Sequence, residues 1–114
     1  MNGTDRLTGK RLSGLAHLRQ SVADILNTPR GSRVLRRDYG SDVPDLVDNP
    51  PGDLTRLRII AASASALARW EPRIGVTGID VFWPAQHACE LSISGVYKQT
   101  GRPVKLEKIT VNGI

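Results

Sequence analysis

The chain has 114 residues, with 16 basic and 11 acidic side chains, a net charge of +5 and few aromatic residues. This length fits one domain whose modest core is built from aliphatic side chains, and no apolar run approaches the length of a membrane span. The whole charge excess lies in residues 1–40, while residues 41–114 carry eight side chains of each sign. A basic patch of this kind suits nucleic acid, an anionic membrane surface or an acidic protein. Composition alone leaves these three partners open.

Cysteine and histidine are too sparse for several kinds of site. Cys89 is the single cysteine, so an internal disulfide is excluded, and its apolar strand context predicts a buried thiol. His17 and His87 are far apart and have no pair of thiolates beside them, so we expect no metal site and no cofactor. The first residues lack the apolar run of a signal peptide, and we expect no Sec-type export.

The first part of the chain predicts an arm and a helix. Residues 1–12 are polar and contain glycine, which predicts a flexible N-terminal arm ahead of a single domain over residues 13–114. From Ser13 the apolar residues recur at spacings of three and four, which predicts a helix from about Gly14 to Asn27. Thr28-Pro29 ends this helix, because proline disfavours the helical conformation of the residue before it.

The next segment, Thr28 to Ser41, has no apolar period and is unusually basic. It carries Tyr39 and four arginines between two glycines, the arginines being Arg30, Arg33, Arg36 and Arg37. Arginines bind carboxylates bidentately at protein interfaces, and they also bind phosphates while an aromatic ring stacks on a base. With one interleaved aromatic and no nucleic-acid motif, the segment favours a protein partner over nucleic acid.

Two further helical segments follow. Asp42 to Asp48 predicts one short helical turn, and Asn49-Pro50-Pro51-Gly52 predicts a break. Asp53 is a good N-cap for a second long helix that runs to about Trp70. The predicted apolar stripe of this helix consists of Leu57, Ile60, Ala61, Ala64, Leu67 and Ala68.

After Pro72 the apolar period changes to two. The parity slips at Thr77-Gly78, which predicts a bulge in a first strand. A second strand has one face formed by His87, Cys89, Leu91, Ile93 and Tyr97. A third strand follows a hairpin and slips near Glu107-Lys108; its apolar residues are Val104, Leu106, Ile109 and Val111. The predicted fold class is α+β, with two main helices followed by a three-stranded antiparallel sheet.

The third strand is predicted to be an edge of the sheet. Lys105, Glu107 and Lys108 are charges of the kind that protect an exposed edge. The other interpretation is that the edge accepts a strand from a second chain through its main-chain groups. These residues by themselves favour simple protection.

A second motif, Trp70-Glu71-Pro72-Arg73, lies between the long helix and the first strand. The helix dipole disfavours a carboxylate at this end of a helix, so Glu71 needs a cation nearby. Either Glu71 pairs within the subunit, with Arg73 or an arginine of residues 30–37, or Glu71 and Arg73 engage a neighbouring subunit. No pair of carboxylates is set out for glycoside hydrolysis, and His87 and Cys89 are better explained as core residues than as a nucleophilic pair. We therefore expect no catalytic residues.

Taken together, these motifs closely resemble the small baseplate wedge proteins of contractile-tailed phages, the phage protein W-like family. The resemblance rests on Thr28-Pro29-Arg30-Gly31-Ser32-Arg33, on Arg36-Arg37-Asp38-Tyr39-Gly40-Ser41 and on Trp70-Glu71-Pro72-Arg73, in this order, and it covers about residues 13–97 well.

The resemblance implies a structural role in the tail baseplate of a virion, assembled in the host cytoplasm. It implies six copies, contact with larger wedge proteins through Glu71, Pro72 and Arg73, and initiation of the contractile sheath. In that role Val104, Leu106, Ile109 and Val111 belong to strands that pair with a sheath subunit, and the arginine segment with Tyr39 binds wedge partners. The family has also carried a lysozyme label, so a peptidoglycan-degrading enzyme is one alternative and a basic nucleic-acid-binding module is the other. Related folds occur in secretion machines and phage-derived tail particles, and the sequence leaves the choice among these settings open.

Overall fold

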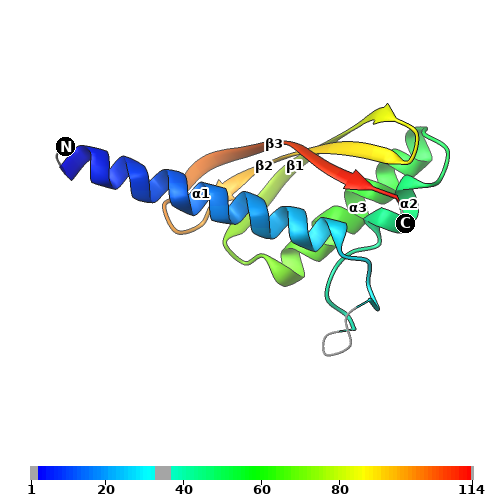
Figure 1. Cartoon of the computed structure of the whole chain (residues 1–114), viewed down its shortest axis with the longest axis horizontal. Coiled ribbons are helices and arrows are strands. Elements are labelled where there is room, and N and C mark those ends of the chain that lie inside the picture. The colour runs from blue at the N-terminus through cyan, green and yellow to red at the C-terminus, as the bar shows by residue number, and fades with distance from the viewer. Residues whose placement is uncertain (1–2, 33–36, 114) are drawn as a thin grey trace.

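Three helices precede a three-stranded antiparallel sheet in the computed structural model, which describes residues 3–32 and 37–113 (Figure 1). The elements in chain order are α1 (Gly3–Asn27), α2 (Val43–Val47), α3 (Asp53–Trp70), β1 (Ile74–Ala85), β2 (Ala88–Tyr97) and β3 (Arg102–Asn112). The strands pair in the order β1-β2-β3, so the sheet is a meander with β1 and β3 at its edges. This arrangement confirms the predicted α+β fold class.

Helix α1 begins at Gly3, which differs from the predicted start near Gly14. Residues 3–12, predicted as a flexible arm, are helical, and their end of α1 projects beyond the sheet in Figure 1. The sequence 6–12 is rich in arginine, lysine and leucine, which favour helix. Because adding a residue to an existing helix is far easier than nucleating one, the packed part of α1 extends upstream.

The second half of α1 supplies part of the core. Leu18, Val22, Ile25 and Leu26 are buried, as their spacing predicts. The helix ends where Thr28 donates both its amide and its hydroxyl to the carbonyl of Asp24. These bonds satisfy a carbonyl at the end of the helix and turn the chain into the arginine segment.

Helix α3 has the predicted length but a different buried face. Its buried residues are Ile59, Ser63, Ala66 and Leu67, while Leu57 of the predicted stripe is 63 % exposed. The N-cap is Gly52 rather than Asp53, which is the first helical residue. Alanines and serines fill much of this helix, so its hydrophobic pattern is too weak to define one face from the sequence.

The sheet contains the two predicted irregularities. The β1–β2 register shifts between Val76 and Gly78. The β2–β3 register shifts opposite the predicted position in β3, where Lys108 has a φ of 56°. Val76↔Gly95 and Gly78↔Ser94 bracket the first shift, which confirms a bulge at Thr77.

His87 lies outside the strand face on which the sequence places it. It is exposed in the β1–β2 turn with a φ of 58°, and its Nδ1 lies 2.9 Å from Oδ1 of Asp48. The alternating pattern of β2 correctly predicts that Cys89 is buried, but it does not apply to His87 in the turn. Strand periodicity ends where the backbone leaves the pleated conformation.

The two long helices cover the same face of the sheet. Helix α3 packs against β1, α1 packs against β3, and the helices contact each other. Cys89, Leu91 and Ile93 of β2 point into this layer and are completely buried. The arginine segment, the α3–β1 corner and the β3 edge therefore lie at the borders of a single two-layer core.

Candidate assembly surfaces

The arginine segment is held at its base by main-chain bonds between its two ends. Ser41 donates its amide to the carbonyl of Thr28 at 2.9 Å, and Gly31 donates to the carbonyl of Arg37 at 2.7 Å. Gly40 has a φ of 109°, and a Cβ there would lie 2.1 Å from the oxygen of Thr28. Only glycine fits this close approach with this backbone conformation. In Figure 1 the described ends of the segment leave the body of the protein on the side away from the sheet.

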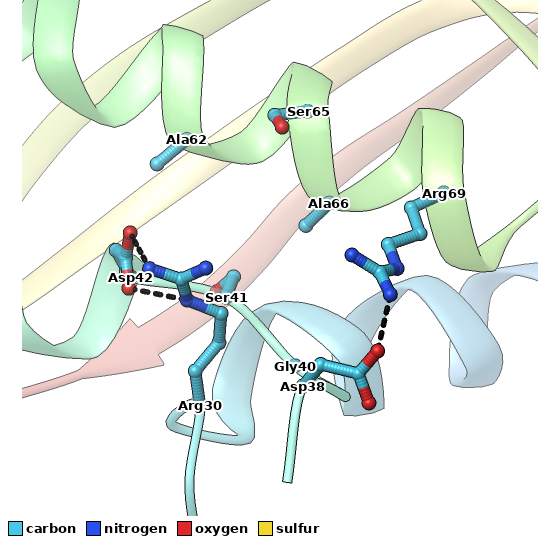
Figure 2. Close-up of a pocket in the computed structure, with 9 residues that line it drawn as sticks. All are labelled: Arg30, Asp38, Gly40, Ser41, Asp42, Ala62, Ser65, Ala66 and Arg69. Carbon is cyan, nitrogen blue, oxygen red and sulfur yellow. Dashed lines mark hydrogen bonds and ion pairs between the residues drawn. The ribbon is translucent and has the colours of Figure 1, made fainter. Parts of the chain in front are cut away.

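Arg30 and Arg69 pair with carboxylates of the same chain beside this segment. Arg30 donates to Asp42 through Nε at 2.8 Å and Nη2 at 3.0 Å. Arg69 of α3 forms an ion pair with Asp38. Figure 2 shows both guanidinium groups beside a hollow between the segment and α3, where Ala62 and Ala66 form the helix side. Because both pairs are about half exposed to solvent, each contributes at most about 1 kcal/mol to stability.

Of the other three arginines predicted for this segment, the structure describes Arg37. Arg37 is exposed, and its carbonyl accepts a hydrogen bond from the amide of Gly31. Arg33 and Arg36 lie outside the described residues. Among the described arginines of the segment, Arg30 pairs with Asp42, and the described partners of Glu71 are Arg73 and Ser21.

Tyr39 contacts its own chain. Its ring packs edge-on against Trp70 of α3, with the ring centroids 5.2 Å apart, and its hydroxyl donates to Asp24 of α1. These contacts connect the arginine segment to both long helices. Tyr39 therefore helps to orient the segment, and it is only half-buried.

Glu71 follows α3 and is 2 % exposed. Arg73 donates to its two carboxylate oxygens at 2.7 and 3.0 Å, and Ser21 of α1 donates its hydroxyl to Oε2. Burial raises the pKa of Glu71, but the hydrogen bonds from Arg73 and Ser21 and the charge of Arg73 outweigh burial and hold this pKa below its ordinary value. The chain thus adopts the pairing of Glu71 with Arg73. Pro72 is exposed and the Arg73 side chain is 38 % exposed, so these two residues form the outer surface of the corner.

The apolar residues predicted for sheath pairing face the protein's own core. Leu106, Ile109 and Val111 are buried, and Val104 is half-buried. What β3 offers another chain is its backbone edge and its outward side chains. Arg19 donates to the carbonyl of Lys108 at 3.1 Å, and Asn27 donates to that of Thr110 at 2.9 Å, so α1 touches part of this edge.

Several residues in these surfaces were missed from the sequence. Asp38 and Asp42 are near the arginines in sequence, and they were a usable signal for pairing within the segment. Ser21 and Arg69 gave no such signal, because each meets its partner across at least 31 residues. Arg19 likewise gave no signal, because its contact with the carbonyl of Lys108 depends on the tertiary structure.

Other kinds of site find little support among the described residues. Cys89 is completely buried, and burial raises the pKa of its thiol to about 11, while His87 bonds to Asp48 outside the core. The two do not form a nucleophilic pair. In the part of the chain that the structure describes, no cluster of three or more metal-ligating side chains occurs. Over that same part, no helix combines the length and apolar character needed to cross a membrane.

Comparisons with known proteins identify the family of the chain. The sequence model of the family described as baseplate wedge protein gp25 matches residues 12–102. Baseplate protein W of Escherichia phage P2 is 36 % identical over 104 residues, which cover 91 % of this chain and 90 % of that protein. The chain belongs to the baseplate wedge protein family.

Two solved structures are also similar. A chain of the post-contraction pyocin R2 baseplate is 44 % identical, with a TM-score of 0.61, and the match covers 72 % of this chain and 83 % of that one. A Geobacter sulfurreducens protein that carries a tail-lysozyme name is 25 % identical, with a TM-score of 0.76 over 89 % of this chain and 92 % of that one.

The protein is therefore a structural component of a contractile-tail baseplate, located in the virion tail, and its family is not an enzyme family.

Proposed function

We propose that this wedge subunit joins larger wedge proteins and starts the contractile sheath by pairing β3 with a strand of a sheath subunit. The observation that carries the proposal is that β3 ends the sheet: its only strand neighbour is β2 among the described residues. A strand with one unpaired edge offers main-chain donors and acceptors to an incoming strand. Six copies around the tail would present six such edges as a ring.

The wedge contacts are assigned to the arginine segment and the corner at residues 71–73. Arg73 is the corner residue suited to touch a partner, since Glu71 is enclosed by Ser21 and Arg73. Glu71 holds the guanidinium in place, and Pro72 directs the chain. A partner carboxylate reaching Arg73 would share a guanidinium whose fork is already oriented, which lowers the entropy cost of binding.

The nucleic-acid alternative is weakened by the ion pairs near the segment. Asp42 and Asp38 form ion pairs with Arg30 and Arg69, so the positive charge of these two arginines is partly neutralised. A phosphate would compete with a carboxylate at each position. This arrangement favours a protein partner that adds to the existing pairs.

The corner is tested by replacing Glu71 and Arg73 with alanine together, which leaves no unpaired buried charge. Because Pro72 and Arg73 bear the contact, we expect a folded subunit but at least about tenfold fewer assembled baseplates, the factor for losing one charge-assisted interface contact. The measurement is counting baseplates and tails by electron microscopy in cells that carry the variant in place of the natural gene. Arg58→Ala removes an exposed arginine elsewhere on α3 and serves as the control. Normal numbers of contractile tails from the double variant would refute the corner contact.

A further inference from the structure

The edge of β3 is divided into two parts by α1. Along the C-terminal part, the carbonyls of Lys108 and Thr110 already accept hydrogen bonds from Arg19 and Asn27. Both donors lie on α1, which runs beside β3 in Figure 1. An added strand would need these same carbonyls, so it competes with two side chains of the subunit itself.

The backbone also breaks at the border between the two parts. Leu91 pairs with Ile109 and Ile93 pairs with Leu106, so β3 has one residue more than β2 across this step. Lys108 takes a φ of 56°, a left-handed conformation that is rare outside glycine. A bulge of this kind disrupts the regular spacing that a neighbouring strand needs. Among the described side chains of α1, those that bond to carbonyls of β3 reach Lys108 and Thr110, which leaves residues 102–107 as the regular run outside these contacts.

The run at residues 102–107 is basic. It carries Arg102 and Lys105 against a single acid, Glu107, whose carboxylate lies 3.6 Å from the ammonium of Lys105. The Lys105 side chain is 55 % exposed and available to a neighbour. Opposite charges on directly opposed residues stabilise strand pairs, and like charges destabilise them.

We propose that the incoming sheath strand pairs along residues 102–107 only, presents carboxylates to Arg102 and Lys105, and stops at Lys108 because α1 closes the remaining edge. This inference rests on the proposed function, since it specifies which part of the edge the sheath strand uses. Arg19 and Asn27 then block strand pairing beyond Lys108, and Lys105 helps to select a partner strand that carries a carboxylate.

Two matched charge reversals test the division of the edge. Lys105→Glu and Lys108→Glu make the same change at two exposed lysines of β3, one in each part. In baseplates that contain either variant, we expect Lys105→Glu to lower the fraction with sheath about fivefold or more, the range set by reversal of one cross-strand charge pair. With Lys108→Glu, the fraction of baseplates with sheath should stay within about twofold of that of the natural protein. Circular dichroism checks that both variants fold.

A second background tests the role of α1. Arg19→Met with Asn27→Ala removes both donors, and Lys108→Glu should then lower the sheathed fraction because the second part of the edge has become available. If Lys108→Glu already acts as strongly as Lys105→Glu in the natural background, the division of the edge is wrong while strand pairing stands. If the double change leaves the effect of Lys108→Glu unaltered, α1 is not what closes the edge. If neither reversal affects sheaths in either background, the inference that carboxylates of the sheath strand meet the basic run at residues 102–107 is wrong.

Discussion

Glu71 is the residue whose chemistry is most specific to this fold. It is a buried carboxylate beyond the C-terminal end of α3, where the helix dipole is unfavourable, and Arg73 and Ser21 supply the donors that stabilise it. The sequence identified the need for a cation and named Arg73 among the alternatives. The hydroxyl of Ser21, 50 residues away, depends on the packing of α1 against the corner.

The pKa of Glu71 predicts a pH dependence of stability. Because the folded protein holds this pKa below its ordinary value of 4.5, the ionised carboxylate stabilises the fold above that pH. The contribution is lost as the pH falls through the lower, folded-state pKa. We expect Glu71→Gln to cost about 1–2 kcal/mol of unfolding free energy at pH 7, allowing for solvent screening at Arg73, and this difference to shrink below pH 4.5. Urea denaturation of both proteins across pH 3–7 measures it; a difference that stays constant over this range would contradict the pairing.

At the scale of the element, α3 shows which features of a helix its sequence pattern predicts. Its ends are predictable, because Pro50-Pro51-Gly52 and Pro72 punctuate the chain on both sides. The orientation of α3 is not predictable in this way, because alanine and serine are compatible with both the buried and the exposed face of a helix. Ile59 and Leu67 are buried while Leu57 is exposed, which places the core face about a third of a turn from a stripe centred on Leu57.

Paired substitutions on α3 test this orientation. Ile59→Ala should lower the unfolding free energy by about 2–4 kcal/mol, because it opens a cavity in the core. Leu57→Ala, which also shortens an aliphatic residue of α3, should stay within about 0.5 kcal/mol of the natural protein. Thermal or urea unfolding of the two variants provides the comparison, and equal losses would mean that α3 packs through the other face.

At the scale of the whole molecule, the helices also protect the sheet. Arg19 and Asn27 of α1 bind carbonyls of β3, and Arg56 of α3 donates to the carbonyl of Val81 in β1. Both edges of the meander are thus partly occupied by side chains from the covering helices. Exposed strand edges promote association between chains, and such contacts oppose it.

Removal of the α1 contacts is expected to change the behaviour of the isolated subunit. Arg19→Met with Asn27→Ala should cost about 1–2 kcal/mol of stability, for two hydrogen bonds, and should increase self-association because more of the β3 edge is free. Sedimentation velocity over a range of concentrations detects this change. Gln20→Ala alters an exposed polar residue on the same helix and is the control. A double variant as monomeric as the control would show that these side chains do not protect the edge.

The sequence by itself determined the order of elements, the bulges at Thr77 and near Lys108, and the family to which the chain belongs. These features depend on local periodicity, on turn residues and on motifs that are continuous in the chain. The tertiary structure decided which face of α3 is buried, which carboxylates meet Arg30 and Arg69, and which side chains of α1 bond to carbonyls of β3. Such choices depend on residues far apart in sequence that folding brings together. The sequence around a charged or small side chain does not indicate which distant residue it will contact.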